Sequence, residues 1–465
     1  VSLMSGKTVS LKTHGDESVE SLRVRAQRVL GVGKGRLLNS AGSILNEGVP
    51  LKKAELQYEE PLTFQVGHVD VCGGRFAFAA ILGDGSVETW GTSQQGGDSS
   101  ALQDQLKNVQ HIQATWHAFA GIRGDGSVVS WGCPDSGGDS GAVRDQLQNV
   151  QQIQASLYAF AAILGDGSVV TWGGSDYGGD SSAVRDQLTN VQHIQATQNA
   201  FAAILSDGSV VTWGDVGAGG DSSAVRDQLK NVQQIQATVS AFAAILADGS
   251  VVTWGNADCG GDSSAVRDQL KNVQQIQATV SAFAAILDDS VVTWGDVVAG
   301  GDSSAVREQL TNVRQIQSTS HAFAAILSDG SVVTWGYANY GGDSSAVRDR
   351  LTNVQQIQAT DDAFAAILED GSVVSWGHAL FGGDSSAVRD QLQNVQQIQA
   401  TVSAFAAILG DGSVVTWGDG CGGDSSAVRD QLTNVHQIQA TSQAFAAVLS
   451  DGSVVSWGRG YSWQR

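Results

Sequence analysis

Residues 159–173 read AFAAILGDGSVVTWG, and this stretch decides the fold. Its first part, residues 159–164, is apolar on both faces, which is typical of a strand held between two neighbouring layers. The Asp166-Gly167 pair predicts a tight hairpin turn, because glycine tolerates a positive φ. The return strand ends on Trp172-Gly173 and is made of β-branched and aromatic residues. The stretch therefore predicts an antiparallel hairpin buried on both faces.

The segments on either side complete a larger unit. Residues 150–156 alternate apolar and polar side chains, the period of a half-buried strand. Residues 178–188 follow the hairpin, where Asp180 or Ser181 can cap a short helical turn whose Val184 and Leu188 face inward. Each unit is thus expected to hold three strands and a short helical or irregular segment.

The unit recurs ten times. A Trp-Gly pair returns every 41 or 40 residues, at Trp90, Trp131, Trp172, Trp213, Trp254, Trp294, Trp335, Trp376, Trp417 and Trp457. One short interval has lost the turn glycine, between residues 287 and 290. No single unit can bury its doubly apolar strand, so neighbouring units must stack.

The order of hairpin, Trp-Gly, Gly-Gly and trailing Val-x-x-Ile-x-Ala resembles the regulator of chromosome condensation repeat. The resemblance covers residues 68–465 and implies a mainly β fold of three- to four-stranded blades, propeller-like in arrangement. That family usually has seven blades and longer repeats. Ten short units could close a larger ring, split into a ring with extra units, or wind as an open superhelical array.

Residues 1–67 contain no repeat and predict a small α+β domain. Residues 18–30 place apolar side chains at helical spacing, and strands are expected near residues 3–11, 36–42 and 62–66. This order, with its closing Leu-x-Phe-x-Val, resembles a ubiquitin-like β-grasp domain with a truncated first strand. The resemblance places a recognition patch at Met4, Leu38 and Gln65, and the polar Gln65 departs from the family. Gly73-Gly74 aligns with Ala114-Thr115 one unit later, so we interpret it as a strand-to-strand turn.

Charge and composition exclude several classes. The chain has a net charge of −21, with nine Lys/Arg against seven Asp/Glu in residues 1–67 and the acidic excess in the repeats. Acidic repeats disfavour direct nucleic-acid binding. No run of 18 apolar residues occurs, so no membrane segment is expected. The four scattered cysteines form no CxxC pair and favour a reducing compartment, the cytoplasm or the nucleus.

The sequence predicts no catalytic, cofactor or metal site. The recurring Asp-Gly-Ser and Gly-Gly-Asp-Ser-Ser motifs place single carboxylates beside turn glycines, whereas calcium loops need clustered oxygen ligands. No His, Ser, Cys or carboxylate constellation stands out from the repeated background, so we expect no enzyme. The ten tryptophans are interpreted first as packing groups, with light sensing as a remote alternative.

Two short windows vary while the rest of each unit hardly changes. One follows Trp-Gly and the other precedes Ala-Phe-Ala. Loops on a rigid repeat scaffold commonly carry binding specificity. Aromatic members are the plausible anchors, namely Trp116, Tyr158, Tyr177, Tyr337, Tyr340 and Phe381. Neutral drift in unconstrained loops explains the same variation equally well.

These observations favour a protein-interaction scaffold or adaptor. The loops would hold a protein partner, and the ubiquitin-like domain, through Met4 and Leu38, would link that partner to ubiquitin or proteasome machinery. One alternative, implied by the repeat family, is guanine-nucleotide exchange on a small GTPase. A second is the substrate-recognition part of a ubiquitin ligase whose catalytic segment lies elsewhere.

Overall fold

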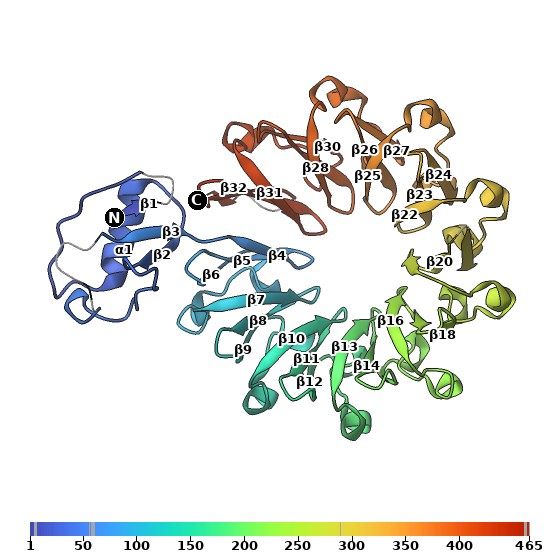
Figure 1. Ribbon diagram of the computed structural model, residues 1–465, viewed down its shortest axis with the longest axis horizontal. Helices are drawn as coiled ribbons and strands as arrows, with labels where there is room; N and C mark the ends of the chain where they lie inside the picture. The colour runs from blue at the N-terminus through green and yellow to red at the C-terminus, as the bar shows by residue number, and fades with distance from the viewer. Residues whose placement is uncertain (4–6, 55, 57–60, 289, 460–462, 465) are drawn as a thin grey trace.

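A computed structural model describes residues 1–3, 7–54, 56, 61–288, 290–459 and 463–464. Ten antiparallel sheets follow one another along the chain, preceded by a small mixed sheet and one helix (Figure 1). The first strand of each unit lies toward the centre of the circle, the second in the middle and the third outside. The tenth sheet gains a fourth strand, β34 (Trp463–Gln464). The expected mainly β architecture of repeated three-stranded units is confirmed.

The units are numbered 1 to 10 along the chain. Their inner strands are β4 (Asp70–Gly73), β7 (Val109–Ala114), β10 (Val150–Ala155), β13 (Val191–Ala196), β16 (Val232–Ala237), β19 (Gln275–Ala278), β22 (Val313–Ser318), β25 (Val354–Ala359), β28 (Val395–Ala400) and β31 (Val435–Ala440). Their middle strands are β5 (Ala77–Ile81), β8 (Ala118–Arg123), β11 (Ala159–Leu164), β14 (Ala200–Leu205), β17 (Ala241–Leu246), β20 (Ala282–Ile286), β23 (Ala322–Leu327), β26 (Ala363–Leu368), β29 (Ala404–Leu409) and β32 (Ala444–Leu449). Their outer strands are β6 (Val87–Gly91), β9 (Val128–Gly132), β12 (Val169–Gly173), β15 (Val210–Gly214), β18 (Val251–Gly255), β21 (Val291–Gly295), β24 (Val332–Gly336), β27 (Val373–Gly377), β30 (Val414–Gly418) and β33 (Val454–Gly458).

The ten units form one closed ring. Strand β31 of unit 10 lies against β4 of unit 1 (Figure 1). One apolar cluster joins Val71 and Phe78 of unit 1 to Ala444, Ala446 and Val448 of unit 10. A single central cavity is lined by residues from all ten units. Of the three arrangements that the repeat count left open, the structure adopts the single ring.

Each unit packs on the one before it through a stacked pair of aromatic rings. In unit 3 the rings of Phe160 and Trp172 lie 5.1 Å apart at 28°, and they cover Ala118 and Ala120 of unit 2. The buried indole N–H of Trp172 donates to the carbonyl oxygen of Gly137 in unit 2 at 2.9 Å. Burying a large apolar side chain contributes about 1.5–3 kcal/mol. All round the ring, the phenylalanine and tryptophan of one unit pack against the small alanines of the unit before it.

No other residue fits at position 137, the glycine whose carbonyl oxygen accepts this hydrogen bond. Gly137 has a φ of +91°, and a Cβ there would lie 2.6 Å from the ring of Phe160. Any side chain would meet both the left-handed backbone strain and the next unit's phenylalanine. The Gly-Gly motif after each Trp-Gly thus has a packing role.

The segment after the hairpin is a short 3₁₀ helix, where a short helical turn was expected. In unit 3 it spans Ser182–Gln187. The Asp180 carboxylate accepts a hydrogen bond from the backbone N–H of Ser182 at 2.9 Å, whereas the Ser181 side chain makes no cap bond. Leu188 is buried and Val184 is half-buried, as predicted.

An outer belt of side-chain hydrogen bonds also links the units. Arg226 of unit 4 donates through Nη2 to Oε1 of Gln187 in unit 3 at 2.9 Å, and the pattern recurs in other units. Arg389 of unit 8 instead faces Arg350 of unit 7, because arginine replaces the usual glutamine at position 350. Burial, and then the charge of Arg389, lower the pKa of Arg350.

The N-terminal domain packs one helix on a mixed sheet. Helix α1 (Val19–Leu30) is capped by the Ser18 hydroxyl, which accepts from the N–H of Ser21, and it ends at Gly31. Strand β3 (Thr63–Val66) lies between β1 (Ser2–Leu3), to which it is parallel, and the antiparallel β2 (Gly35–Leu38).

Two expected strands of this domain are shorter than predicted. The hairpin near residues 3–11 is reduced to a bridge between Ser2 and Thr8, and its turn lies outside the described residues. The strand expected over 36–42 ends at Leu38, because the Asn39 side chain accepts the N–H groups of Ala41 and Ser43 and turns the chain. Among the described residues, no helix is long and apolar enough to cross a membrane.

Candidate partner-binding face

A belt of backbone hydrogen bonds surrounds one end of the central cavity. The N–H of Trp116 in unit 2 donates to the carbonyl of Leu157 in unit 3 at 3.0 Å, and Leu157 donates to Gln198 of unit 4 at 3.0 Å. Nine such bonds run from Arg75 in unit 1 to Ser442 in unit 10. Within the described part of the chain, the tenth link, from Ser442 back to Arg75, is not made. The belt holds one residue of each unit at the cavity mouth in an equivalent position.

The two variable windows meet on this face, which we call the cavity face. In unit 3 the hydroxyl of Ser156, just before the first window, donates to the carbonyl oxygen of Tyr177 in the second window at 2.7 Å. The window that precedes Ala-Phe-Ala, called the first window because it comes first along each unit, holds two residues per unit. In order, these are Arg75-Phe76, Trp116-His117, Leu157-Tyr158, Gln198-Asn199, Val239-Ser240, Val280-Ser281, Ser320-His321, Asp361-Asp362, Val402-Ser403 and Ser442-Gln443.

Aromatic rings of units 1 to 3 form one continuous group. The guanidinium of Arg75 lies 4.0 Å from the centre of the Trp116 ring. Trp116 meets Tyr158 edge-on with centroids 6.0 Å apart, and Tyr158 meets Tyr177 edge-on at 4.6 Å. We call the whole group the cationic sector, and it comprises Arg75, Phe76, Trp116, His117, Tyr158 and Tyr177.

A second group lies on units 7 and 8. The His321 ring is 4.9 Å from that of Tyr340, which lies 5.0 Å from Tyr337. The His378 ring meets Phe381 edge-on at 5.1 Å. With the neighbouring carboxylates these rings form the acidic sector, which comprises His321, Tyr337, Tyr340, Asp361, Asp362, His378 and Phe381.

The two sectors differ in electrostatics. Burial, and then the charge of Arg75, lower the pKa of His117, so this ring is neutral at physiological pH. Burial raises the pKa of Asp361 against the opposing effect of His321. Burial and the adjacent Asp361 raise the pKa of Asp362 to about 6, although His378 acts in the opposite direction. The side chains of His321 and His378 each bury an Nδ1 atom that has no hydrogen-bond partner among the described residues.

The predicted anchors therefore fall into two places. Trp116, Tyr158 and Tyr177 are brought together in the cationic sector, and Tyr337, Tyr340 and Phe381 lie in the acidic sector. Tyr337 is 41% exposed, and the other five are half-buried. The sequence reasoning missed Arg75 and Phe76, although they stand one repeat before Trp116-His117.

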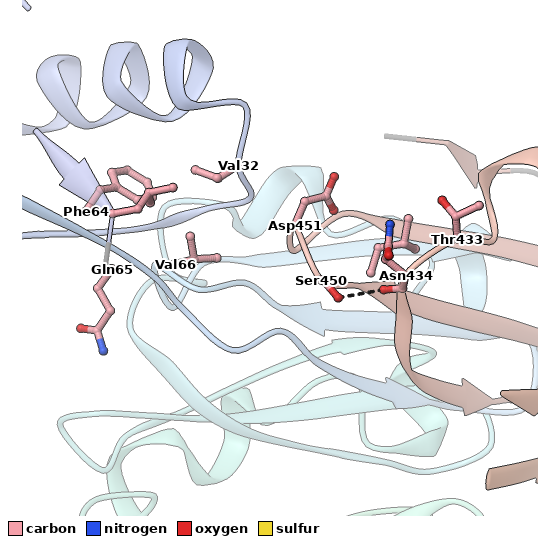
Figure 2. A pocket seen from close by; sticks show the side chains of 10 residues that line it. Val32, Phe64, Gln65, Val66, Thr433, Asn434, Ser450 and Asp451 are labelled. Carbon is pink, nitrogen blue, oxygen red and sulfur yellow. Dashed lines mark hydrogen bonds between the residues drawn. The ribbon is translucent and has the colours of Figure 1, made fainter. Parts of the chain in front are cut away.

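The patch predicted on the N-terminal domain is separate from both sectors. Met4 lies outside the described residues, and Leu38 is half-buried on β2. Gln65 lines a cleft of about 600 Å³ between this domain and unit 10. Figure 2 shows Val32, Phe64, Gln65 and Val66 on one side of the cleft and Thr433, Asn434, Ser450 and Asp451 on the other.

The repeated aspartate carboxylates accept hydrogen bonds from the serine of their own hairpin turn. In unit 3 the Asp166 carboxylate accepts the backbone N–H of Ser168 at 2.9 Å and its hydroxyl at 2.7 Å. These hydrogen bonds lower the pKa of Asp166, and the same holds for equivalent aspartates in other units. In the described part of the chain, no group of three or more His, Cys, Asp or Glu side chains is placed to hold a metal ion.

Comparison with known proteins gives structural likenesses only. No protein-family model matches the chain, and no curated protein matches it in sequence. Among solved structures the chain is similar to Prp20p from Saccharomyces cerevisiae, studied for its binding to Gsp1p and histones, with 16% identity, 68% of this chain and 82% of that chain covered, and a TM-score of 0.36.

Two further structures are similar to a comparable degree. One is that of Kap60 bound to yeast RCC1 (Prp20), with 19% identity, 59% of this chain and 71% of that chain covered, and a TM-score of 0.33. The other is the computationally designed Ika8 protein, with 13% identity, 67% and 96% coverage, and a TM-score of 0.30. We therefore base the function on the chain's own residues.

Proposed function

We propose that this chain is a binding scaffold whose cavity face holds a protein partner through the cationic sector. The observation that carries the proposal is the uneven placement of aromatic residues on an even backbone. Units 5, 6 and 9 carry Val-Ser in the first window, whereas units 2 and 3 carry Trp-His and Leu-Tyr. Large aromatic side chains that are half-exposed and grouped around an arginine are the common anchors of protein interfaces.

The repeat offers a matched test of this proposal. Trp116→Val with Tyr158→Ser installs residues that units 5, 6 and 9 already carry in the same positions. The double variant should fold as the parent does and lose its partner. The control is Val239→Ala with Ser240→Ala in unit 5, outside both sectors. Affinity capture with the full chain, quantified by mass spectrometry, should retain one set of proteins for the parent and control and lose it for the double variant. Identical sets for all three chains would refute the proposal.

The proposal also covers the absence of catalysis, the compartment and the role of the N-terminal domain. Binding of this kind needs no chemical step, so we propose a non-enzymatic role, in the cytoplasm or nucleus. A link of the N-terminal domain to ubiquitin or proteasome machinery is tested by titrating the full chain with ubiquitin receptors. Nucleotide release from a panel of small GTPases tests the exchange alternative, and thioester transfer tests the ligase alternative. No acceleration and no transfer would remove the last two.

A further inference from the structure

The central cavity carries two charges of opposite sign. About 780 Å³ in volume, it is lined by three residues from each of the ten units. Arg75 and Asp361 are the two ionisable residues in this lining. Both occupy the belt position of their unit, where the N–H of Arg75 donates to Trp116 at 3.1 Å and that of Asp361 to Val402 at 3.0 Å. Their inner strands, β4 and β25, lie on different sides of the opening in Figure 1.

Neither charge is neutralised by a side chain of the described residues. Arg75 makes no ion pair there and lies over the Trp116 ring, which leaves its charge intact. The opposing influence on Asp361 comes from His321 alone. This contrasts with the hairpin aspartates, whose carboxylates are satisfied by serine. Holding an uncompensated charge at a partly buried site costs free energy, which a partner of opposite charge recovers.

The aromatic rings beside each charge indicate what surrounds the partner's charged groups. Phe76 and Trp116 flank the Arg75 guanidinium, and Tyr340 belongs to the sector that contains Asp361. A planar guanidinium framed by aromatic rings suits a carboxylate on an apolar stem, and a carboxylate near aromatic rings suits an ammonium or guanidinium. Electrostatic complementarity of this kind sets the orientation of a bound chain.

We propose, resting on the function proposed above, that the partner is a polypeptide segment that spans the cavity mouth with an acidic side chain on Arg75 and a basic side chain on Asp361. Units between the two sectors present small or neutral residues, such as Val402 and Ser442, over which the segment passes. The segment therefore binds in one direction.

Selection from a display library of random-sequence peptides on the immobilised full chain tests the inference. The parent should enrich peptides with one acidic and one basic residue separated by a neutral spacer. Arg75→Gln should abolish the acidic preference and keep the basic one. Asp361→Val, the residue of unit 9 at this position, should do the reverse. Arg28→Gln and Asp268→Asn, at exposed positions elsewhere, make matched charge changes and should leave both preferences intact.

Two outcomes separate the possible failures. Enrichment of peptides with no charge preference, or preferences that survive both cavity variants, overturns the charge assignment while leaving the binding face in place. A second selection on the Trp116→Val, Tyr158→Ser chain tests the face itself. If that chain enriches the same peptides as the parent, the proposed function fails as well.

A second inference comes from the seam between units 10 and 1. In the regular contact, the hairpin glycine of one unit packs on an asparagine of the next. A Cβ on Gly167 of unit 3 would lie 2.7 Å from Cα of Asn190 in unit 4, whose φ is +54°. The N–H of the following Val191 donates to the carbonyl oxygen of Gly167 at 2.8 Å. Eight hairpins meet the next unit's asparagine in this way, at Gly85, Gly126, Gly167, Gly208, Gly249, Gly330, Gly371 and Gly412.

At the tenth hairpin the N-terminal domain takes the place of that asparagine. Gly452 of unit 10 packs against Gly33, with a Cβ-to-Cα distance of 3.2 Å for a built side chain, and against Val66 at 3.6 Å. The N–H of Gly33 donates to the carbonyl oxygen of Asp451. Figure 2 shows Val32 and Val66 beside the Asp451 turn.

The N-terminal domain also makes polar contacts with unit 1. The ammonium of Lys34 donates to the Ser86 hydroxyl at 3.0 Å and lies 3.4 Å from the Glu88 carboxylate. Glu88 stands where the other nine units have valine. The hairpin carboxylate of Asp84 is 8% exposed beneath the domain and lies 3.6 Å from Arg23, whereas its counterpart Asp125 in unit 2 is 65% exposed. Unit 1 thus carries residues suited to this contact.

We infer that the N-terminal domain completes the ring by bridging units 10 and 1 at the seam where, within the described part of the chain, the belt hydrogen bond from Ser442 to Arg75 is not made. Two variants loosen the bridge without disturbing a unit. Glu88→Val installs the residue of the other nine units. Gly83→Ser installs the residue found at Ser206 of unit 4, but its Cβ would lie 2.2 Å from the carbonyl oxygen of Lys34.

Hydrogen exchange of the full chain measures the effect. Both variants should speed exchange several-fold in β31 and β32 of unit 10, which neither substitution touches, and leave β16 and β17 on unit 5 unchanged. Gly410→Ser, the same change at the equivalent hairpin position of unit 9, is the control. Exchange in unit 10 equal to that of the parent, or a rise spread evenly over all ten units, would overturn the inference.

Discussion

The contacts between units and the cavity face follow opposite rules. Between units, the same phenylalanine and tryptophan pack on the same alanines in every unit. On the cavity face, two positions per unit change from Arg-Phe to Val-Ser to Asp-Asp on a backbone that does not change. The difference teaches that the interior makes the units interchangeable, whereas the face makes each unit distinct. Substitutions in the first set should act alike in every unit, and those in the second should depend on the unit.

The largest effect is expected from removing a ring between units. Phe242→Ala in unit 5 and Phe323→Ala in unit 7 each delete a fully buried ring. Each should lower the free energy of unfolding by about 3–5 kcal/mol, because a cavity replaces the ring. Urea denaturation followed by tryptophan fluorescence measures it. A difference between the two variants of more than about 1 kcal/mol would break the rule that the units are equivalent.

A smaller loss is expected from the tryptophan hydrogen bond. Trp213→Phe keeps an aromatic ring but removes the N–H that donates to Gly178 at 3.0 Å. The loss should be about 1–3 kcal/mol, because a buried carbonyl oxygen is left without a donor. Tyr337→Ala, on the exposed cavity face, is the comparison and should change the free energy of unfolding by less than about 1 kcal/mol. Equal losses in the two variants would contradict the comparison.

Acid titration should separate the two kinds of aspartate. Asp362 has a folded pKa of about 6 against an ordinary value of 3.8, so its contribution to stability falls as pH rises through that interval. Asp362→Ser should therefore raise the melting temperature at neutral pH, with Asp361, His321 and His378 as the remaining ionisable neighbours. The hairpin Asp411 has a lowered pKa, so its contribution is lost as pH falls below its ordinary value. Asp411→Asn should lower the melting temperature at neutral pH and have little effect in acid. The same sign for both variants would contradict the assignment.

The smallest effect concerns the outer belt. Arg350→Gln restores the acceptor that other units offer to the following arginine and removes the Arg350–Arg389 repulsion. Because both groups are exposed, the gain in unfolding free energy should be about 0.2–1 kcal/mol and should shrink in high salt. Gln269→Arg, which creates the same clash between units 5 and 6, should cost a similar amount. A gain that survives high salt would point to a packing effect instead.

The sequence alone predicted the local structure well because each element depends on neighbours within a few residues. The strands around Ala159–Leu164 and Val169–Gly173, the Asp166 turn and helix α1 all follow from residue spacing and turn chemistry. Closure of the ring could not be predicted from the sequence, because the angle between units depends on how Phe160 and Trp172 pack on the alanines of the preceding unit. Periodicity carries no information about that angle.

The sequence did not reveal the seam contacts or the part of the cavity face around Arg75, for a related reason. Gly33 and Lys34 act at the ring from a domain outside the repeat, so no internal comparison could reveal them. Arg75 stood in the first unit, where the repeat is least regular, although aligning it with Trp116 would have exposed it. The candidate anchors Trp116 and Tyr158 stood out in the sequence because the other copies of the unit are nearly identical.

Ring closure also bears on how the number of copies can change. A full turn divided among ten equal units gives about 36° each, while nine or eleven would need about 40° or 33°. The change of roughly 4° per contact is small beside the spread of about 25° that neighbouring strands show in their twist. Gain or loss of one copy by recombination between near-identical segments is therefore compatible with the contacts between units. The distance between the two hairpins at Asp84 and Asp451 is more tightly constrained, because the N-terminal domain contacts both of them.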